Sequence, residues 1–134
     1  MQLSHSIIRK GFIAAGLMNL SVLIFSRGFT NAVIAEYDAE LMSDVGLLMI
    51  ILWGLAYISV ANNYQHVKWL VGVFALEKFI YGCAWIRWMS NHSLADVAAK
   101  DRMAAAFYAT YGINDWVFCW FFLFVFLQLV RNKP

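Results

Sequence analysis

The stretch VKWLVGVFALEKFIYGCAWIRWM, residues 67–89, decides the fold. It is long enough for a helix that crosses a bilayer, which needs about 20 mainly apolar residues. Lys68 and Arg87 stand close to its two ends, where long basic side chains reach the membrane interface. Glu77 and Lys78 interrupt the apolar run near its middle. The sequence therefore predicts a membrane-spanning helix with charged residues deep inside it.

The composition of the whole chain is typical of a membrane protein. Of its 134 residues, 63% are hydrophobic and only 13% are charged, whereas soluble domains carry about 25% charged residues. A soluble domain of this size leaves too much surface exposed to cover so many apolar side chains. The formal net charge of +2 is too small for a nucleic-acid-binding face. We expect one integral membrane domain over residues 1–134, in contact with the lipid bilayer and with no nucleic-acid partner.

Three other apolar segments accompany the first, so we expect an all-α protein. We place the spans at about 7–28, 45–61, 67–89 and 107–130. Basic residues before the first segment are also typical of a signal peptide, but no persuasive small-x-small cleavage site follows. We therefore expect a retained first helix. The whole chain is predicted to form a four-helix transmembrane bundle, with short interfacial helices on the non-cytoplasmic side.

An even number of spans places both termini on the same side of the membrane. That side carries five basic residues, Arg9, Lys10, Lys68, Arg131 and Lys133. The opposite side carries four, Arg27, Arg87, Lys100 and Arg102. Because basic residues concentrate on the cytoplasmic side, the count favours cytoplasmic termini by a narrow margin. We expect a bacterial inner membrane protein.

The two connections on the outer side each carry a helix signal. In the first, apolar residues recur every four positions, at Phe29, Val33, Tyr37 and Leu41. This spacing predicts a short helix that lies on the membrane surface. In the second, Ser93 of SLAD (residues 93–96) has the place of an N-terminal cap. We expect a helix from Leu94 to about Tyr111 that ends at Gly112, because glycine commonly terminates helices.

The depth of Glu77 and Lys78 requires partners from other helices. Glu77 lies nine residues beyond Lys68, roughly 13–14 Å along a helix and close to the bilayer midplane. A charged group there costs about 2.5–3.5 kcal/mol on insertion scales, so it normally faces the bundle. Adjacent helical residues do not share a face, so Glu77 and Lys78 cannot simply neutralise each other.

Polar residues of other spans reach a similar depth. Asn19 follows Lys10 by nine residues, and Ala15 and Gly16 before it give a small surface where another helix can approach. The fourth span contributes TYGINDW, residues 110–116. We predict a ligand-binding polar cluster of Asn19, Glu77, Lys78, Tyr81, Tyr111, Asn114 and Asp115. The candidates for catalysis within it are Glu77, Lys78 and Asp115.

Asp115 has an alternative interpretation. After a helix break at Gly112, Asn114 could cap the fourth span, with Asp115 in its first turn near the positive helix end. Residues 113–130 would still cross the membrane core. Asp115 would then lie at the outer surface, away from Glu77.

Glu77 and Lys78 also allow two interpretations. They could form a structural bond that fixes helix register, or they could bind a ligand or handle protons. If Glu77 and Asp115 both face one lysine, one carboxylate lacks a counter-charge, and we expect it to hold a proton. A protonated-carboxyl infrared band that Glu77→Gln removes is the expected sign.

The remaining conspicuous residues are predicted to be structural. Trp53 and Tyr57 share a helix face, which is more often packing than a cofactor box. His5, His66 and His92 lie outside the apolar cores at different levels, so we expect no haem, no other cofactor and no metal. Cys83 and Cys119 lie in apolar runs without ligand spacing, and we expect both to be small buried hydrophobes.

A four-span chain with Glu77 in its third span and Gly82 shortly after it resembles the bacterial DoxX-like membrane proteins. This spacing is the only motif, although the topology covers most of the chain. The resemblance implies a compact four-helix bundle, often beside an oxidoreductase or a quinone-linked partner. Lys78 and the long second outer connection depart from the family pattern. Small four-helix multidrug exporters also use a membrane glutamate, but in the first helix, where this chain has none.

We expect an accessory or ligand-binding membrane protein whose polar cluster holds a partner helix or an amphiphilic, quinone-like or sterol-like molecule. Its partners would be the bilayer and either a larger membrane complex or a hydrophobic small molecule. The alternative is a proton-coupled small transporter or intramembrane enzyme in which Glu77 exchanges the proton, assisted by Lys78 or Tyr81. A transporter or an enzyme needs a cavity that reaches Glu77, whereas an accessory protein can keep the site closed.

Overall fold

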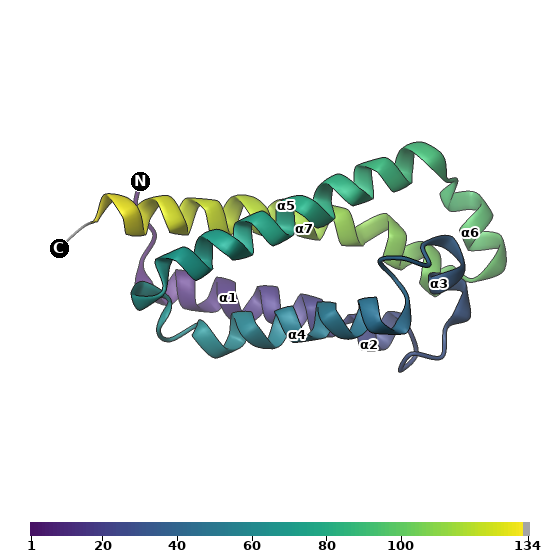
Figure 1. The fold of residues 1–134 in the computed structure, drawn as a ribbon, viewed down its shortest axis with the longest axis horizontal. Helices are drawn as coiled ribbons and strands as arrows, with labels where there is room; N and C mark the ends of the chain where they lie inside the picture. Colours follow the sequence, from purple (N-terminus) through teal and green to yellow (C-terminus); the bar gives the residue numbers. More distant parts are fainter. Residues whose placement is uncertain (133–134) are drawn as a thin grey trace.

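The computed structural model describes residues 1–132, and within them it contains helices and no strand. Four long helices lie side by side (Figure 1). They are α1 (His5–Leu20), α4 (Asp44–Val60), α5 (Lys68–Asn91) and α7 (Arg102–Arg131). Four short elements connect or extend them: α2 (Val22–Phe25), α3 (Ala32–Tyr37), the 3-10 helix η1 (Tyr64–His66) and α6 (Leu94–Lys100). The N-terminus lies at the η1 end, while α3 and α6 lie at the opposite end.

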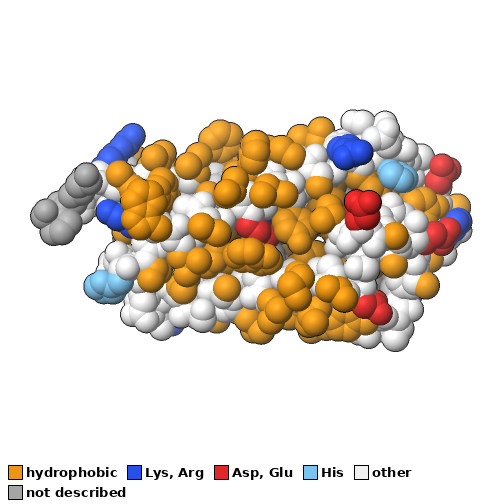
Figure 2. Space-filling model, in the orientation of Figure 1, with side chains coloured by type: hydrophobic (Ala, Val, Ile, Leu, Met, Phe, Trp, Pro, Cys, Tyr) orange, Lys and Arg blue, Asp and Glu red, His pale blue; other side chains and the backbone are white. Residues whose placement is uncertain are grey.

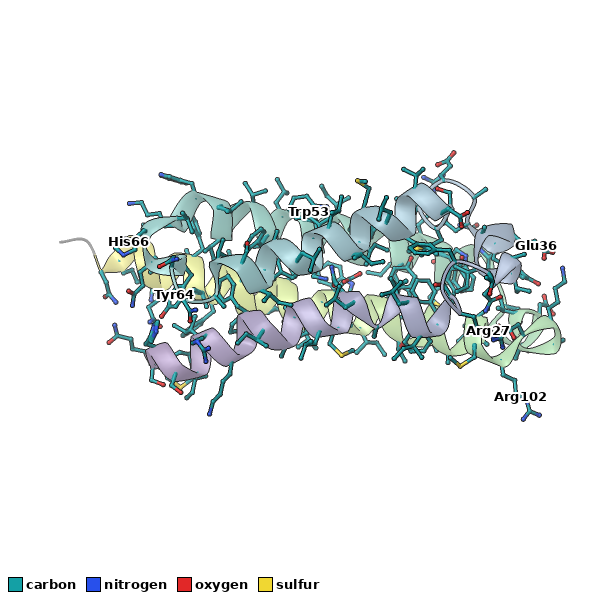
Figure 3. The ribbon with its side chains drawn as sticks, turned by 90° about the horizontal axis from the view of Figure 1, so that it is seen from below. Arg27, Glu36, Trp53, Tyr64, His66 and Arg102 are labelled. Carbon is teal, nitrogen blue, oxygen red and sulfur yellow. The ribbon has the colours of Figure 1, made fainter. Side chains whose placement is uncertain are left out.

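The four long helices form two tight pairs. α1 packs along α4, and α5 packs along α7, with α6 folded back against α7. Figures 1 and 3 together place α4 and α5 on one flank of the molecule and α1 and α7 on the other. Close backbone approaches between the pairs occur mainly where α1 and α2 meet α7.

Glycines set the distance between α1 and α4. A Cβ atom on Gly16 would lie 2.6 Å from the carbonyl oxygen of Gly54, and one on Gly54 would lie 2.9 Å from the carbonyl oxygen of Gly16. No real side chain fits at that distance. The pair therefore has the small-residue contact that lets helices associate without a large apolar driving force.

In the contact between α5 and α7, each helix supplies a tryptophan that packs on a glycine of the other. Trp116 of α7 lies over Gly82 of α5 and donates from Nε1 to the Gly82 carbonyl at 3.2 Å. Trp85 of α5 lies over Gly112 of α7 and donates to the Tyr108 carbonyl at 2.7 Å. Each indole thus fills the space that a missing side chain leaves, and its N–H is satisfied inside the helix pair.

Aromatic side chains fill the space between the pairs. Phe12, Tyr57, Phe74 and Phe122, one from each long helix, are fully buried together. The Tyr57 and Phe74 rings meet edge to face at a centroid distance of 4.8 Å, a favourable geometry for aromatic pairs. A second core near α6 is built around Trp88, whose ring stacks on Tyr108 at 4.1 Å.

Three stretches of helix are long and apolar enough to cross a membrane. They are His5–Phe25, which joins α1 and α2, together with α5 and α7, and their mean hydropathies are 1.6, 1.4 and 1.8. α4 is apolar but shorter, with 17 residues. On the face that Figure 2 shows, hydrophobic side chains cover most of the middle, and most charged side chains lie towards the ends. Figure 3 places Arg27, Glu36 and Arg102 at one end.

The predicted helix break at Gly112 is wrong. α7 runs without interruption from Arg102 to Arg131, and the chain turns instead at Asp101, after the short α6. Gly112 lies in mid-helix because its missing side chain makes room for Trp85. Ser93 stands at the cap position of α6 as predicted, but its side chain makes no capping hydrogen bond.

The connection between α2 and α4 is also less helical than its pattern predicts. α3 covers only Ala32–Tyr37, and Phe29 has a φ of 68°, which excludes it from a helix. The predicted surface helix over this stretch is therefore wrong in extent. The apolar residues Phe29, Val33, Tyr37 and Leu41 pack partly buried against the second core. Packing onto the ends of the long helices thus explains their spacing.

Asp101 ties the connection between α2 and α4 to α7. Its carboxylate accepts the backbone N–H of Ala104 at 2.9 Å as an N-terminal cap. It also accepts Nη2 of Arg27 at 2.8 Å and Nδ2 of Asn31 at 2.6 Å. The Arg27 hydrogen bond, followed by that from Asn31, lowers the pKa of Asp101 below its ordinary value.

Candidate functional site

Lys78 is the centre of the site. It projects from α5 into the space between the helix pairs, and the residue is only 1% exposed. Its Nζ donates to Oδ1 of Asp115 on α7 and to Oδ1 of Asn19 on α1, both at 2.8 Å. A buried ammonium is tolerated only when such partners replace its water shell. Lys78 therefore connects α5 to α1 and α7.

Glu77 points elsewhere, as expected for the neighbouring residue of a helix. Its carboxylate accepts a short hydrogen bond from the hydroxyl of Tyr57 on α4. Glu77 is 7% exposed and Tyr57 is fully buried. The Lys78 Nζ also lies 5.3 Å from the centre of the Tyr57 ring, within cation–π range. Glu77 and Lys78 together thus contact all three other long helices.

Asn19 completes these contacts from α1. Its Nδ2 donates to the carbonyl oxygen of Ile50 on α4 at 2.9 Å, while its Oδ1 accepts from Lys78. The close approach of Gly16 and Gly54 brings the two backbones near enough for the first of these bonds. These hydrogen bonds and the ion pair join five residues, and from here on the polar cluster means only these five: Asn19, Tyr57, Glu77, Lys78 and Asp115.

The alternative interpretation of Asp115 as a helix-end residue is wrong. Asp115 lies well inside α7, is 6% exposed and forms an ion pair with Lys78 at 2.8 Å. Asn114 does not cap a helix either. It is half-buried, and its Nδ2 is 3.5 Å from Oδ1 of Asp115, at the limit of a hydrogen bond.

A cavity of about 200 Å³ lies beside the polar cluster. We call it the side cavity. Its wall is formed by Met18, Asn19, Ser21, Val22, Phe25, Ile50, Glu77, Lys78, Tyr81, Phe107, Thr110, Tyr111, Asn114 and Asp115. All seven residues predicted for the ligand-binding cluster, Asn19, Glu77, Lys78, Tyr81, Tyr111, Asn114 and Asp115, line it.

The hydroxyl of Tyr111 is the unusual group in this wall. The residue is 8% exposed, and its oxygen has no hydrogen-bond partner among residues 1–132. A buried hydroxyl without a partner costs roughly 1–3 kcal/mol. Tyr111, whose residue lines the side cavity, therefore carries an unused donor and acceptor.

The charges of the polar cluster do not balance. Glu77 and Asp115 are two acids, and Lys78 is one base, so full ionisation would leave a net charge of −1. Only Asp115 contacts the ammonium directly. Glu77, paired with a neutral hydroxyl, is the carboxyl that lacks a counter-charge.

A larger hollow of about 760 Å³ lies at the η1 end, away from these charges. It is lined mainly by residues of the first turn, η1 and the end of α7, including His5, Tyr64, His66 and Gln128. Nδ1 of His5 is 3.1 Å from the Tyr64 hydroxyl. No group of three or more metal-ligating side chains occurs in the part of the chain that the structure describes.

Two residues behave differently from their predicted roles. Tyr57 was expected to be packing only, whereas it bonds to Glu77. A tyrosine inside an apolar helix has a hydroxyl that needs a partner, which is the signal for such a role. Cys83 is exposed on α5, so its predicted burial is wrong, because it lies outside the set of buried residues of α5. Cys119 is buried as predicted, and Trp53 packs edge-on against Phe74.

Comparisons with known proteins add no relative. No family model matches the chain, and neither a curated protein nor a solved structure matches it.

Proposed function

We propose that all four long helices cross a membrane as a four-helix transmembrane bundle, with both termini on the cytoplasmic side of a bacterial inner membrane. Three stretches of sufficient length and hydropathy support this. α4, with 17 residues, is about 26 Å long, slightly less than the roughly 30 Å of a bilayer core. The basic residues support the orientation, and the resemblance to DoxX-like proteins agrees with the architecture.

Within that bundle, the proposed role is to bind the polar head of an amphiphilic molecule in the side cavity. The observation that carries this proposal is the unpartnered Tyr111 hydroxyl, buried in a wall that also holds the Lys78–Asp115 ion pair. A purely structural network would be expected to satisfy all its buried polar atoms. A ligand oxygen beside Tyr111 would remove the deficit.

Extraction of the protein from its native membrane tests this function. The purified protein is extracted with organic solvent, and bound molecules are identified by mass spectrometry. Wild type is expected to carry one amphiphile, whose occupancy falls roughly fivefold or more in Tyr111→Phe, as expected for one lost hydrogen bond. Tyr37→Phe is the matched control, because Tyr37 lies outside the side cavity. An empty wild-type protein that co-purifies with a larger membrane protein would support the accessory function instead.

A second candidate function is proton exchange by Glu77. It is favoured by the charge imbalance of the polar cluster and by the Tyr57 bond, which leaves Glu77 without a cationic partner. A proton on Glu77 would make the cluster neutral. The expected result is a protonated-carboxyl infrared band in wild type that disappears in Glu77→Gln and persists in Glu40→Gln. A band that Glu77→Gln leaves unchanged would contradict proton storage at this residue.

A further inference from the structure

We propose that the side cavity is loaded laterally from the bilayer, through an opening between α1–α2 and α7, and that it takes a single-ring headgroup bearing a carbonyl oxygen. This inference rests on the ligand-binding function above. It adds the route, the size and the hydrogen-bonding chemistry of the ligand.

The exposure of the wall residues shows where the cavity opens. Its floor, with Asn19, Lys78 and Asp115, is buried. Met18 on α1 is 46% exposed, and Thr110 on α7 is also exposed. The opening therefore lies on the flank where α1 and α2 meet α7, and not at an end of the molecule.

The opening lies within the apolar belt of the proposed bundle. Met18 is seven residues from the end of α2, and Thr110 is eight residues from the start of α7, so both lie roughly 10–12 Å in from the helix ends. The neighbouring outward-facing residues are apolar, with Leu17 and Ile113 exposed. A molecule that enters here comes from the lipid phase.

The wall residues on the opposite flank are less exposed. Its wall residues, Ile50 on α4 and Tyr81 on α5, are only partly exposed. Acidic side-chain atoms are nevertheless visible among the hydrophobic side chains at the middle of this face in Figure 2. The two flanks are therefore rival routes that an experiment can separate.

The size of the cavity limits the ligand to one ring. An apolar cavity of about 150 Å³ accepts benzene, whereas sites for drug-sized molecules are roughly 300–1,000 Å³. At about 200 Å³, the side cavity has room for one substituted ring. The fused rings of a sterol are too large. A hydrocarbon tail would have to leave through the opening beside Met18 and Thr110.

The unused donors in the wall select an acceptor oxygen. Tyr111 has a free hydroxyl. Lys78 has three N–H donors, of which Asn19 and Asp115 take two. Both residues line the side cavity. A ring carbonyl placed between them would accept from both, while Phe25, Phe107 and Tyr81 supply aromatic walls for the ring.

Duroquinone, a tetramethyl-substituted single-ring quinone, is a suitable probe, and durene is the benzene with methyl groups at the same four positions and no oxygens. Binding is measured by calorimetry on the full chain in lipid nanodiscs. Duroquinone is expected to bind at least tenfold more tightly than durene, and Tyr111→Phe should remove most of that difference. Equal binding of the two probes, or tight binding of cholesterol, would overturn the headgroup assignment.

The route is tested by stopped-flow mixing of the same nanodiscs with duroquinone-loaded vesicles. Thr110→Trp narrows the proposed opening, and Met49→Trp adds the same bulk to the opposite flank, at an exposed residue of α4 outside the cavity wall. Thr110→Trp is expected to slow association at least tenfold and Met49→Trp to leave it within twofold, provided that both variants keep the wild-type melting temperature. Slowing by Met49→Trp, or by neither variant, would overturn the lateral route through α1 and α7.

The experiments separate a failure of the single-ring assignment from a failure of the ligand-binding function. A native amphiphile found in the extracted protein, together with no duroquinone binding, would overturn the single-ring assignment and leave the ligand-binding function standing. An extract without any amphiphile, and no binding of any probe, would overturn both.

Discussion

Lys78 is the residue on which the polar cluster depends. Its ammonium lies between acceptors from α1 and α7, and its backbone belongs to α5. Removing two charges from water is costly, and a buried ion pair is often no more stabilising than apolar packing. Losing one partner is different, because the other charge then stays buried without compensation. The cluster therefore specifies the mutual position of three helices more than it adds stability.

Lys78→Met is expected to destabilise the protein by about 3–5 kcal/mol, the usual result of breaking a buried pair from one side. The measurement is unfolding in mixed micelles of increasing denaturing detergent. The double variant Lys78→Met with Asp115→Leu should recover much of the loss, because no unpaired charge remains. Additive losses in the double variant would show that Lys78 and Asp115 act independently.

For single residues, the position along each helix was the quantity that predicted the site. Counting from the interfacial lysines brought Asn19, Glu77 and Lys78 to one level of the molecule, and the structure places all three in the wall of one cavity. The sequence did not predict the polar role of Tyr57, because packing alone is enough to explain an aromatic residue in an apolar helix. Its hydroxyl partner lies on another helix, and no spacing within one helix can reveal it.

At the scale of elements, glycine has a different role from the one that its local preferences suggest. Gly112 lies in the middle of a 30-residue helix, where glycine normally weakens helical structure. The Trp85 ring packs on Gly112 and makes glycine favourable there. In the same way, the Trp116 ring packs on Gly82. The sequence alone predicted a helix end at Gly112 because propensity is a local property. The indole that needs the space comes from another helix.

Gly112→Ala is expected to destabilise the protein by about 1–3 kcal/mol, as overpacking typically does. An added Cβ would lie 1.8 Å from the Trp85 ring. Gly72→Ala is the matched control, since its Cβ would lie 3.2 Å from the Phe126 ring, and its effect should be smaller. Thermal unfolding in detergent measures both. Combining Gly112→Ala with Trp85→Leu should restore stability, and a failure to do so would place the strain elsewhere.

The cap at Asp101 makes the stability of the end that holds α3 and α6 dependent on pH. Hydrogen bonds from Arg27 and Asn31 lower the pKa of Asp101 in the folded protein. The stabilisation is therefore fully present above the ordinary aspartate pKa of about 4, and it is lost as the pH falls through the lower folded value. Asp101→Asn cannot titrate, so its melting temperature should fall less than that of wild type below this pH.

Asp96→Asn is the control for this comparison, because Asp96 is exposed in the first turn of α6. It should retain the wild-type acid sensitivity. Equal acid profiles for wild type and Asp101→Asn, from pH 5 downwards, would show that Asp101 does not contribute to the pH dependence.

For the whole molecule, the order of apolar segments predicted the arrangement better than it predicted the ends of the helices. The predicted spans 45–61 and 67–89 differ from α4 and α5 by only one or two residues at each end. The predicted span 107–130 starts five residues after the start of α7, and those five residues were predicted to belong to the helix that begins at Leu94. α6 instead folds back and packs against α7.

Labelling of single cysteines tests the proposed threading. In a variant with Cys83→Ser and Cys119→Ala, Gln65→Cys is expected to react with an impermeant maleimide only after the inner side is opened. Asp96→Cys should react in intact cells. The reverse pattern would invert the orientation, and equal accessibility of both positions from one side would exclude an odd number of crossings between them.

The division into two helix pairs has a mechanical consequence. α1 and α4 are held by a close backbone contact at glycines, and α5 and α7 by indole rings packed on glycines, whereas the space between the pairs contains aromatic rings, a small void and a few polar bonds. The interface between the two helix pairs should therefore deform more easily than either pair. Filling or emptying the side cavity should change the angle between the pairs. A neighbouring protein that touches both pairs could respond to that angle without touching the bound molecule.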